Sequence, residues 1–221
     1  MQNQSLVTRH SSLQKGFTLA EIIIVVMILA FISTISFRTY YDLREKQDFN
    51  NALNQIVELI KTARNDAITS QAVYLETAPE TPIIPSKGYG VFINLTPTET
   101  EAHLTLFANT SVQGNFADQF DEEDSILEKL SLPASITFDK LFKLSPTELR
   151  GIPDTGTDIG NQAVILFRPP VAETFLSNNG DPTIPENLID TLSIQLFPKS
   201  QATRKKVITI DKIGGIPAIH L

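Results

Sequence analysis

The sequence predicts an α+β protein in which a long N-terminal helix precedes a β-rich domain. All 13 prolines lie at or after Pro79, and Gly16 is the only glycine before Gly88. Residues 17–78 therefore contain neither helix breaker, which favours one long helix. After Pro79, short β-type runs alternate with turns, and several alternate apolar with polar residues, as antiparallel strands do when one face is wet. The helix is expected to be transmembrane in its first third, amphipathic in the remainder, and packed on this C-terminal antiparallel sheet.

The first third of the helix has the length of a membrane span. Residues 17–37 are 21 residues with Glu21 as the only charged one, about 31 Å of helix and close to the thickness of a bilayer's hydrocarbon core. The preceding residues 1–16 contain Arg9 and Lys15 and no acid. The positive-inside tendency keeps this leader cytoplasmic and places the rest of the chain across the membrane.

Two details distinguish this segment from an ordinary secretory signal. Such a signal carries small residues for cleavage after its apolar stretch, whereas here Gly16 stands before the stretch. A carboxylate such as Glu21 is costly inside a membrane span, so by default it indicates a function and requires a partner.

The order Lys15-Gly16-Phe17-Thr18-Leu19-Ala20-Glu21, followed by the apolar run, resembles the N-terminus of type IV pilins and type II secretion pseudopilins. The resemblance implies that prepilin peptidase cuts after Gly16, that the new N-terminal Phe17 is N-methylated, and that Glu21 directs assembly. Glu21 would pair with the α-ammonium of Phe17 of a neighbouring subunit, since a lone carboxylate in the apolar layer is unfavourable. The simpler alternative, an uncleaved signal anchor with an incidental Glu21, explains the topology but not the order of these residues.

This chain departs from the family pattern at two positions of the span. Many members have a helix-breaking proline where it has Arg38, and often a glycine where it has Ala30. Local melting of the helix on assembly is therefore not expected for this subunit.

The helix continues beyond the membrane as an amphipathic segment, residues 38–75, and is predicted to end near residue 73. Its apolar residues follow one another at spacings of four and three, which places them on one face aimed at a core; they are Phe49, Leu53, Ile56, Ile60, Ala63 and Ala67. The charged residues between them are assigned to the solvated side, Lys46, Arg64 and Asp66 among them. A free coiled coil is the alternative, but the stripe is short and no leucine heptad persists.

Residues 76–221 form the predicted β-rich domain. Gly214-Gly215 reads as the turn of a hairpin between the last two strands. We expect surface loops at 145–162 and 177–190, because both ranges are rich in Pro, Gly, Asn and Asp. Such loops could contact other subunits. The predicted strands are Tyr89–Leu95, His103–Phe107, Ala134–Phe138, Ala163–Phe167, Leu192–Phe197, Lys206–Ile210 and Ile216–His220.

Three further stretches, 63–68, 88–92 and 204–211, look like minor pseudopilins of the GspH/FimT type. This resemblance implies a β-sandwich-like soluble domain built on the end of the long helix. Some members of that group bind DNA through an arginine in the C-terminal segment. Residues 214–221 contain no arginine, which speaks against a DNA-uptake role.

Composition narrows the function classes further. Removal of the leader leaves 16 Lys and Arg against 25 Asp and Glu, a net charge of −9, and this acidic balance argues against broad binding of phosphate backbones. The chain has no cysteine, so a domain exported beyond the membrane must be stabilised by burial alone.

An acidic run at residues 118–124 raises the question of a calcium site, because hard cations prefer clustered oxygens. Asp118 and Asp121 are the weak candidate ligands, and the spacing matches an EF-hand only loosely. The favoured interpretation is a solvated loop that leads into a short helix at Asp124–Leu130, with acids at its start. No cofactor is expected.

The densest basic cluster is Arg204-Lys205-Lys206, a candidate patch for DNA or anionic lipid. The favoured interpretation is the exposed side of an edge strand, where lysine discourages pairing with other chains.

No catalytic pattern is present: there is no cysteine, and only His103 and His220 follow the leader. We therefore expect a non-enzymatic filament subunit, minor rather than major, that is processed by a peptidase. It would be a single-pass inner-membrane protein with its soluble domain outside the cytoplasm, and then part of a pilus or pseudopilus. Its expected partners are other subunits, prepilin peptidase, the inner-membrane assembly platform and membrane lipid. The alternatives are a DNA-binding competence-type minor pilin and, less favoured, a membrane-anchored exported enzyme.

Overall fold

The computed structural model of the protein describes residues 17–75, 78–85, 87–96, 103–110, 120, 124–143, 157–178, 189–213 and 215–220. The chain divides into two units, residues 1–44 and 45–221, and each is described by itself. Helix α1 (Leu19–Thr69) begins in the first unit and ends in the second.

In the first unit, the described residues 17–44 are almost entirely helical and expose their apolar side chains. Every large apolar residue from Ile22 to Ile32 is about half exposed or more. The hydroxyls in this stretch are satisfied within the helix, since Ser33 Oγ donates to the carbonyl of Leu29 at 2.7 Å and Thr34 Oγ1 to that of Ala30 at 2.9 Å. The segment thus offers an apolar surface and few unsatisfied polar groups.

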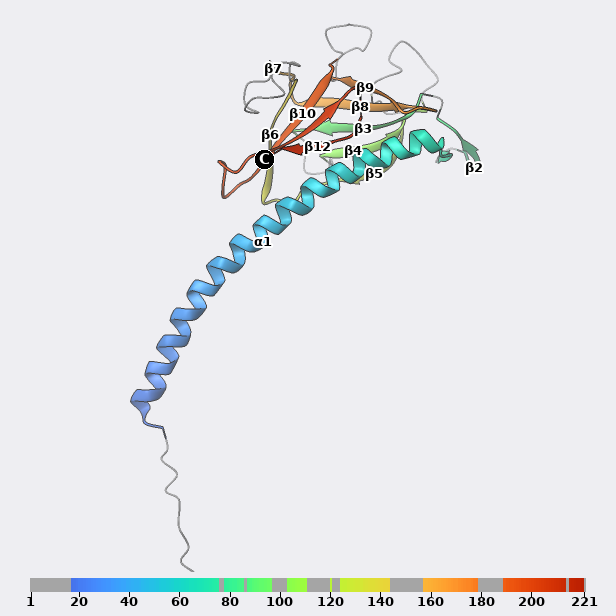
Figure 1. Ribbon diagram of the computed structural model, residues 1–221. Coiled ribbons are helices and arrows are strands. Elements are labelled where there is room, and N and C mark those ends of the chain that lie inside the picture. The colour runs from blue at the N-terminus through green and yellow to red at the C-terminus, as the bar shows by residue number, and fades with distance from the viewer. Residues whose placement is uncertain are drawn as a thin grey trace, which may run out of the picture. The chain divides into compact units, whose positions relative to one another are not determined.

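The second unit contains two five-stranded antiparallel sheets and a small two-stranded one (Figure 1). The first large sheet has the order β12-β11-β10-β6-β7, the second the order β5-β4-β3-β8-β9, and β1 pairs with β2. The strands are β1 (Val73–Leu75), β2 (Ala78–Ile83), β3 (Tyr89–Asn94), β4 (Leu104–Ala108), β5 (Ser125–Leu130), β6 (Ile136–Lys143), β7 (Thr157–Asp158), β8 (Gln162–Arg168), β9 (Glu173–Ser177), β10 (Thr191–Pro198), β11 (Lys206–Asp211) and β12 (Ala218–His220).

One hydrophobic core joins the C-terminal part of α1 to both large sheets. All six residues of the predicted stripe are buried, from Phe49 at 2% exposure to Ala67 at 0%. The sheets contribute alternate residues of their strands, such as Val91 of β3 and Ile194 of β10. Each strand thus turns one face toward the helix, and the predicted long helix on antiparallel sheets is confirmed.

Helix α1 ends at Thr69, four residues before the predicted end. Ser70 adopts a positive φ of 49°, its N–H donates to Ala67 at 3.3 Å, and the N–H of Gln71 donates to Asp66 at 3.1 Å. These two bonds form a Schellman motif. The position is usually glycine, and its occupation by serine explains why the sequence gives no stop signal here.

A side-chain hydrogen bond also connects this end of the helix to the sheet. The hydroxyl of Tyr89, a residue with no exposed surface, donates a hydrogen bond to the carbonyl of Gln71. Burial and the nearby Asp66 carboxylate raise the pKa of Tyr89 to about 12. The same burial raises the pKa of Asp66, so Asp66 is not the fully solvated residue that the sequence predicted.

The seven predicted strands are present with shifted ends, and β11 and β12 form the predicted C-terminal hairpin. The prediction of a short helix at Asp124–Leu130 is wrong. That segment is β5, which pairs with β4 so that Ile126 lies opposite Phe107, and this pairing outweighs the acidic start that suggested a helix. The sequence also did not predict four further strands, β1, β2, β7 and β9. Strand β2 contains Pro79 and Pro82 and pairs with β1.

Candidate functional site

The first candidate site is the start of α1, where Thr18 and Glu21 form a capping box. The Glu21 carboxylate accepts hydrogen bonds from the Thr18 N–H at 2.8 Å and from its hydroxyl at 2.9 Å. The Glu21 N–H donates to Thr18 Oγ1 at 3.3 Å. Thr18 is therefore the N-cap and Glu21 the third helical residue, the spacing at which each side chain satisfies an unpaired N–H of the other.

This geometry assigns a local role to the only charged residue of the 17–37 segment. The first turn of a helix carries a partial positive charge and unpaired N–H groups, which stabilise a carboxylate. Phe17, next to the N-cap, is 83% exposed. Gly16 and the rest of the leader lie outside the described residues.

Within the described residues, α1 is the one helix whose length and composition would allow it to cross a membrane. An 18-residue window of it has a mean hydropathy of 2.5, and none of that window is buried. The capping box thus lies at the beginning of an exposed apolar helix.

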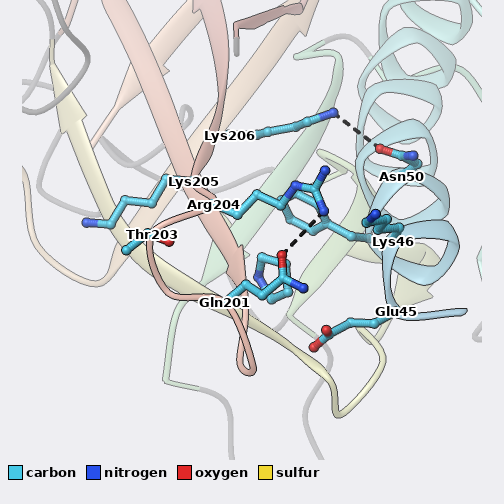
Figure 2. A pocket seen from close by; sticks show the side chains of 10 residues that line it. Glu45, Lys46, Asn50, Gln201, Thr203, Arg204, Lys205 and Lys206 are labelled. Carbon is cyan, nitrogen blue, oxygen red and sulfur yellow. Dashed lines mark hydrogen bonds between the residues drawn. The ribbon is translucent and has the colours of Figure 1, made fainter. Parts of the chain in front are cut away.

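The second candidate site is a basic pocket of about 410 Å³ in the second unit. One wall is the stretch of α1 from Glu45 to Asn50, and the other is the connection between β10 and β11 (Figure 2). The lining residues are Glu45, Lys46, Phe49, Asn50, Pro198, Gln201, Thr203, Arg204, Lys205 and Lys206. We refer to this site as the basic pocket.

Backbone hydrogen bonds shape the β10–β11 connection. The Gln201 N–H donates to the carbonyl of Pro198 at 2.9 Å, and the Arg204 N–H donates to that of Gln201 at 2.8 Å. At the start of the connection, the Lys199 N–H donates to Ser135 at 2.9 Å. Two consecutive turns therefore hold the segment before β11, and Arg204 extends from the second one.

Arg204 and Lys206 face α1, whereas Lys205 points away from it (Figure 2). Lys206 Nζ donates to Asn50 Oδ1 at 3.2 Å and lies 5.8 Å from the centre of the Phe49 ring. Lys205 forms an ion pair with Asp139 at 2.8 Å. The predicted patch Arg204-Lys205-Lys206 is thus split between two directions.

Helix α1 supplies a third cation, Lys46, which the sequence placed only on a solvated face. Lys46 and Asn50 are four residues apart and so lie on one side of the helix. Their spacing was visible in the sequence, but no local signal linked them to residues more than 150 positions later. The edge-strand interpretation of the cluster is wrong, because β11 lies between β10 and β12.

Glu45 is the one acidic residue that lines the pocket. It accepts hydrogen bonds from the backbone N–H of Ser200 at 3.3 Å and from the Ser200 hydroxyl. Its carboxylate therefore fastens the β10–β11 connection to α1. In the part of the chain that the structure describes, no carboxylate forms an ion pair with Lys46, Arg204 or Lys206.

The other candidate sites, for calcium and at His103, form no binding or catalytic arrangement among the described residues. Asp118 and Asp121, the candidate calcium ligands, lie outside them, and among the described residues no group of three or more His, Cys, Asp or Glu could hold a metal ion. His103 accepts a hydrogen bond at Nδ1 from the Leu132 N–H at 3.2 Å, and burial lowers its pKa. That bond gives it a structural role.

Comparison with known proteins identifies the N-terminal segment. Residues 11–37 match the family described as the prokaryotic N-terminal methylation motif. The match includes Gly16, Phe17, the capping box and most of the exposed apolar helix. No curated protein and no solved structure matches the chain significantly. Residues 11–37 are therefore similar to the prokaryotic N-terminal methylation motif, and this similarity covers the start of the chain alone.

Proposed function

We propose that the chain is a structural subunit of a type IV pilus or a type II secretion pseudopilus, cut after Gly16 and assembled through its N-terminal helix. The observation that carries this proposal is the methylation motif over residues 11–37, whose only carboxylate, Glu21, lies in the first turn of an exposed apolar helix.

The exposed apolar surface of residues 22–32 supports the same role. A helix that is apolar on all sides is stable when buried in lipid or among other helices. In the proposed sequence of events, this segment lies first in the inner membrane and then among the helices of neighbouring subunits. Glu21 then pairs with the α-ammonium of a neighbour's Phe17, and charge neutralisation sets the stagger between subunits.

The proposed organisation follows from these roles. Residues 1–16 are a cleaved cytoplasmic leader, 17–37 the membrane and assembly helix, 38–75 its amphipathic continuation, and 76–221 a soluble domain outside the cytoplasm. We further propose a minor subunit, similar to the GspH/FimT type, because the soluble domain is large and the ranges 145–162 and 177–190 are rich in Pro, Gly, Asn and Asp.

N-terminal mass spectrometry of the membrane-extracted protein tests the proposal. In cells that contain prepilin peptidase, the mature chain should begin at N-methylated Phe17. A Gly16→Ala variant is the matched control and should retain the leader. An intact leader on the wild-type chain in such cells would refute the proposal, and a chain cut elsewhere would refute the assignment of Gly16.

A further inference from the structure

We propose that the basic pocket binds the phosphate group of an anionic phospholipid at the membrane surface. The proposal rests on insertion of residues 17–37 in a membrane, but not on cleavage after Gly16 or on filament assembly. Three cations, Lys46, Arg204 and Lys206, converge on one cavity from two parts of the second unit.

The chemistry of the lining suits a phosphate. A guanidinium group such as that of Arg204 can donate two parallel hydrogen bonds to phosphate oxygens, and ammonium groups bind phosphate as point charges. Arg204, a lining residue, donates a hydrogen bond from Nη1 to Gln201 Oε1 at 3.3 Å. The Thr203 hydroxyl and the amides of Asn50 and Gln201 add neutral polar groups.

Among the described residues that line the pocket, the acidic one, Glu45, accepts hydrogen bonds from Ser200. The lining also includes Phe49, only 2% exposed, and Pro198. A cavity lined by both cations and apolar side chains suits a headgroup that carries apolar glycerol and acyl carbons next to its phosphate.

The position of the pocket in the chain favours lipid over other phosphates. Glu45 follows Phe37, the last residue of the apolar segment, by eight positions. The headgroup layer adds about 5–8 Å to each side of the hydrocarbon core. The residues of α1 that line the pocket therefore come soon after the apolar segment in the sequence.

Two tyrosines support this position relative to the membrane surface. Tyr40 and Tyr41 are 60% and 64% exposed and lie between the apolar segment and the pocket in the sequence. Tyrosine is enriched where the membrane meets water. The interface is thus expected near residues 40 and 41.

Nucleic acid fits these observations less well. Binding to a duplex relies on a stripe of basic residues that follows the backbone, whereas here the cations meet in one cavity of about 410 Å³. Lys205, which would extend the patch, faces the other way and pairs with Asp139.

Native mass spectrometry of the full chain in detergent tests the proposal. The chain is offered equal amounts of phosphatidylglycerol and phosphatidylcholine, and the retained lipid is counted. The wild type should retain phosphatidylglycerol preferentially. Arg204→Gln should weaken this preference by roughly fivefold, from the usual attraction of one basic residue to an anionic surface, and the triple variant Lys46→Gln/Arg204→Gln/Lys206→Gln should abolish it.

A matched control separates the pocket from general charge. The triple variant Lys61→Gln/Lys129→Gln/Lys143→Gln removes the same total charge as the pocket variant, from exposed positions outside the pocket, and should keep the preference. Circular dichroism establishes that each variant is folded, and Arg204→Lys, which keeps the charge, should retain part of the preference.

Several outcomes would overturn the proposal. They are equal retention of both lipids by the wild type, and an equal loss of preference in the pocket variants and the control. Displacement of the lipid by inorganic phosphate at the same concentration would identify a free-phosphate site instead. Duplex DNA that binds the wild type more tightly than phosphatidylglycerol, and is lost in the pocket variant, would identify a nucleic-acid site.

Discussion

The Glu21 carboxylate accepts hydrogen bonds from both the backbone N–H of Thr18, at 2.8 Å, and its hydroxyl, at 2.9 Å. A charged group in an apolar layer needs such partners, and here they come from the same chain. In the proposed filament, the α-ammonium of Phe17 would add an ionic partner from a neighbouring subunit. The carboxylate would then serve both to begin the helix and to position the next subunit.

Substitution of Glu21 should separate processing from assembly. We expect Glu21→Ala to be cut after Gly16 like the wild type but to be absent from filaments, because the pairing charge is lost. Mass spectrometry of the N-terminus and immunoblotting of sheared filaments measure the two steps. Glu21→Gln keeps an acceptor for Thr18 without the charge and should fail in the same way; normal assembly of Glu21→Gln would mean that capping, not charge, is the contribution of Glu21.

Loss of the N-cap hydroxyl should loosen the first turn of α1. Replacement of an N-cap threonine by a residue without an acceptor costs about 1 kcal/mol, so in Thr18→Val the amides of residues 19–22 should exchange hydrogen roughly fivefold faster. Hydrogen exchange of the full chain in detergent micelles measures this. Thr18→Ser retains the hydroxyl and should behave as the wild type; equal protection in Thr18→Val would show that the capping box does not hold this turn.

Gly90 should not tolerate a side chain. A Cβ at this position would lie 2.5 Å from Cζ of the Phe107 ring and 2.8 Å from the carbonyl oxygen of Ile165. Overpacking of this kind costs about 1–3 kcal/mol, so Gly90→Ala should lower the free energy of unfolding by that amount in thermal or denaturant melts. In a Phe107→Leu background the cost should be smaller, since part of the clash is removed; strictly additive effects would contradict the contact.

Removal of the Tyr89 hydroxyl should weaken the junction between α1 and the sheet. Tyr89→Phe leaves the Gln71 carbonyl without this donor, and a lost buried hydrogen bond costs about 1 kcal/mol. Denaturant unfolding of the full chain should show the loss. Tyr74→Phe, at a tyrosine that is 64% exposed, is the control and should have little effect.

Acid should destabilise the fold through His103. Burial lowers its folded pKa below the ordinary 6.5, so the unfolded chain binds more protons between the folded pKa and 6.5. Stability is then fully present above about pH 6.5 and falls as the pH is lowered through that window. His103→Gln, which does not titrate, should lose less stability than the wild type between about pH 7.5 and 5.5. An equal loss in both chains would assign the acid sensitivity to other groups.

Much of the fold could be predicted because it depends on local patterns. The stripe from Phe49 to Ala67 repeats at helical spacing, and all of it is buried. Alternation in Leu192–Phe197 and Lys206–Ile210 predicted two strands that pair with each other. The segment Asp124–Leu130 could not be assigned in this way, because pairing with β4, not its own composition, makes it a strand.

The two candidate sites also differ in how far the sequence alone could predict them. Gly16, Phe17 and Glu21 could be proposed as site residues from the sequence, because the motif is contiguous and its capping box spans one turn of helix. The basic pocket could not be, since Lys46 and Asn50 come from α1 while Arg204 and Lys206 come from the other end of the chain. Which way Lys205 points also depends on Asp139, a residue of β6.

The sequence by itself determined the N-terminal motif, the apolar span and the buried face of the helix, because each depends on spacing along a continuous segment. The tertiary structure alone decided the strand order and the convergence of three cations on one cavity. These features depend on contacts between residues far apart in the chain, and such contacts leave no periodic signal in the sequence.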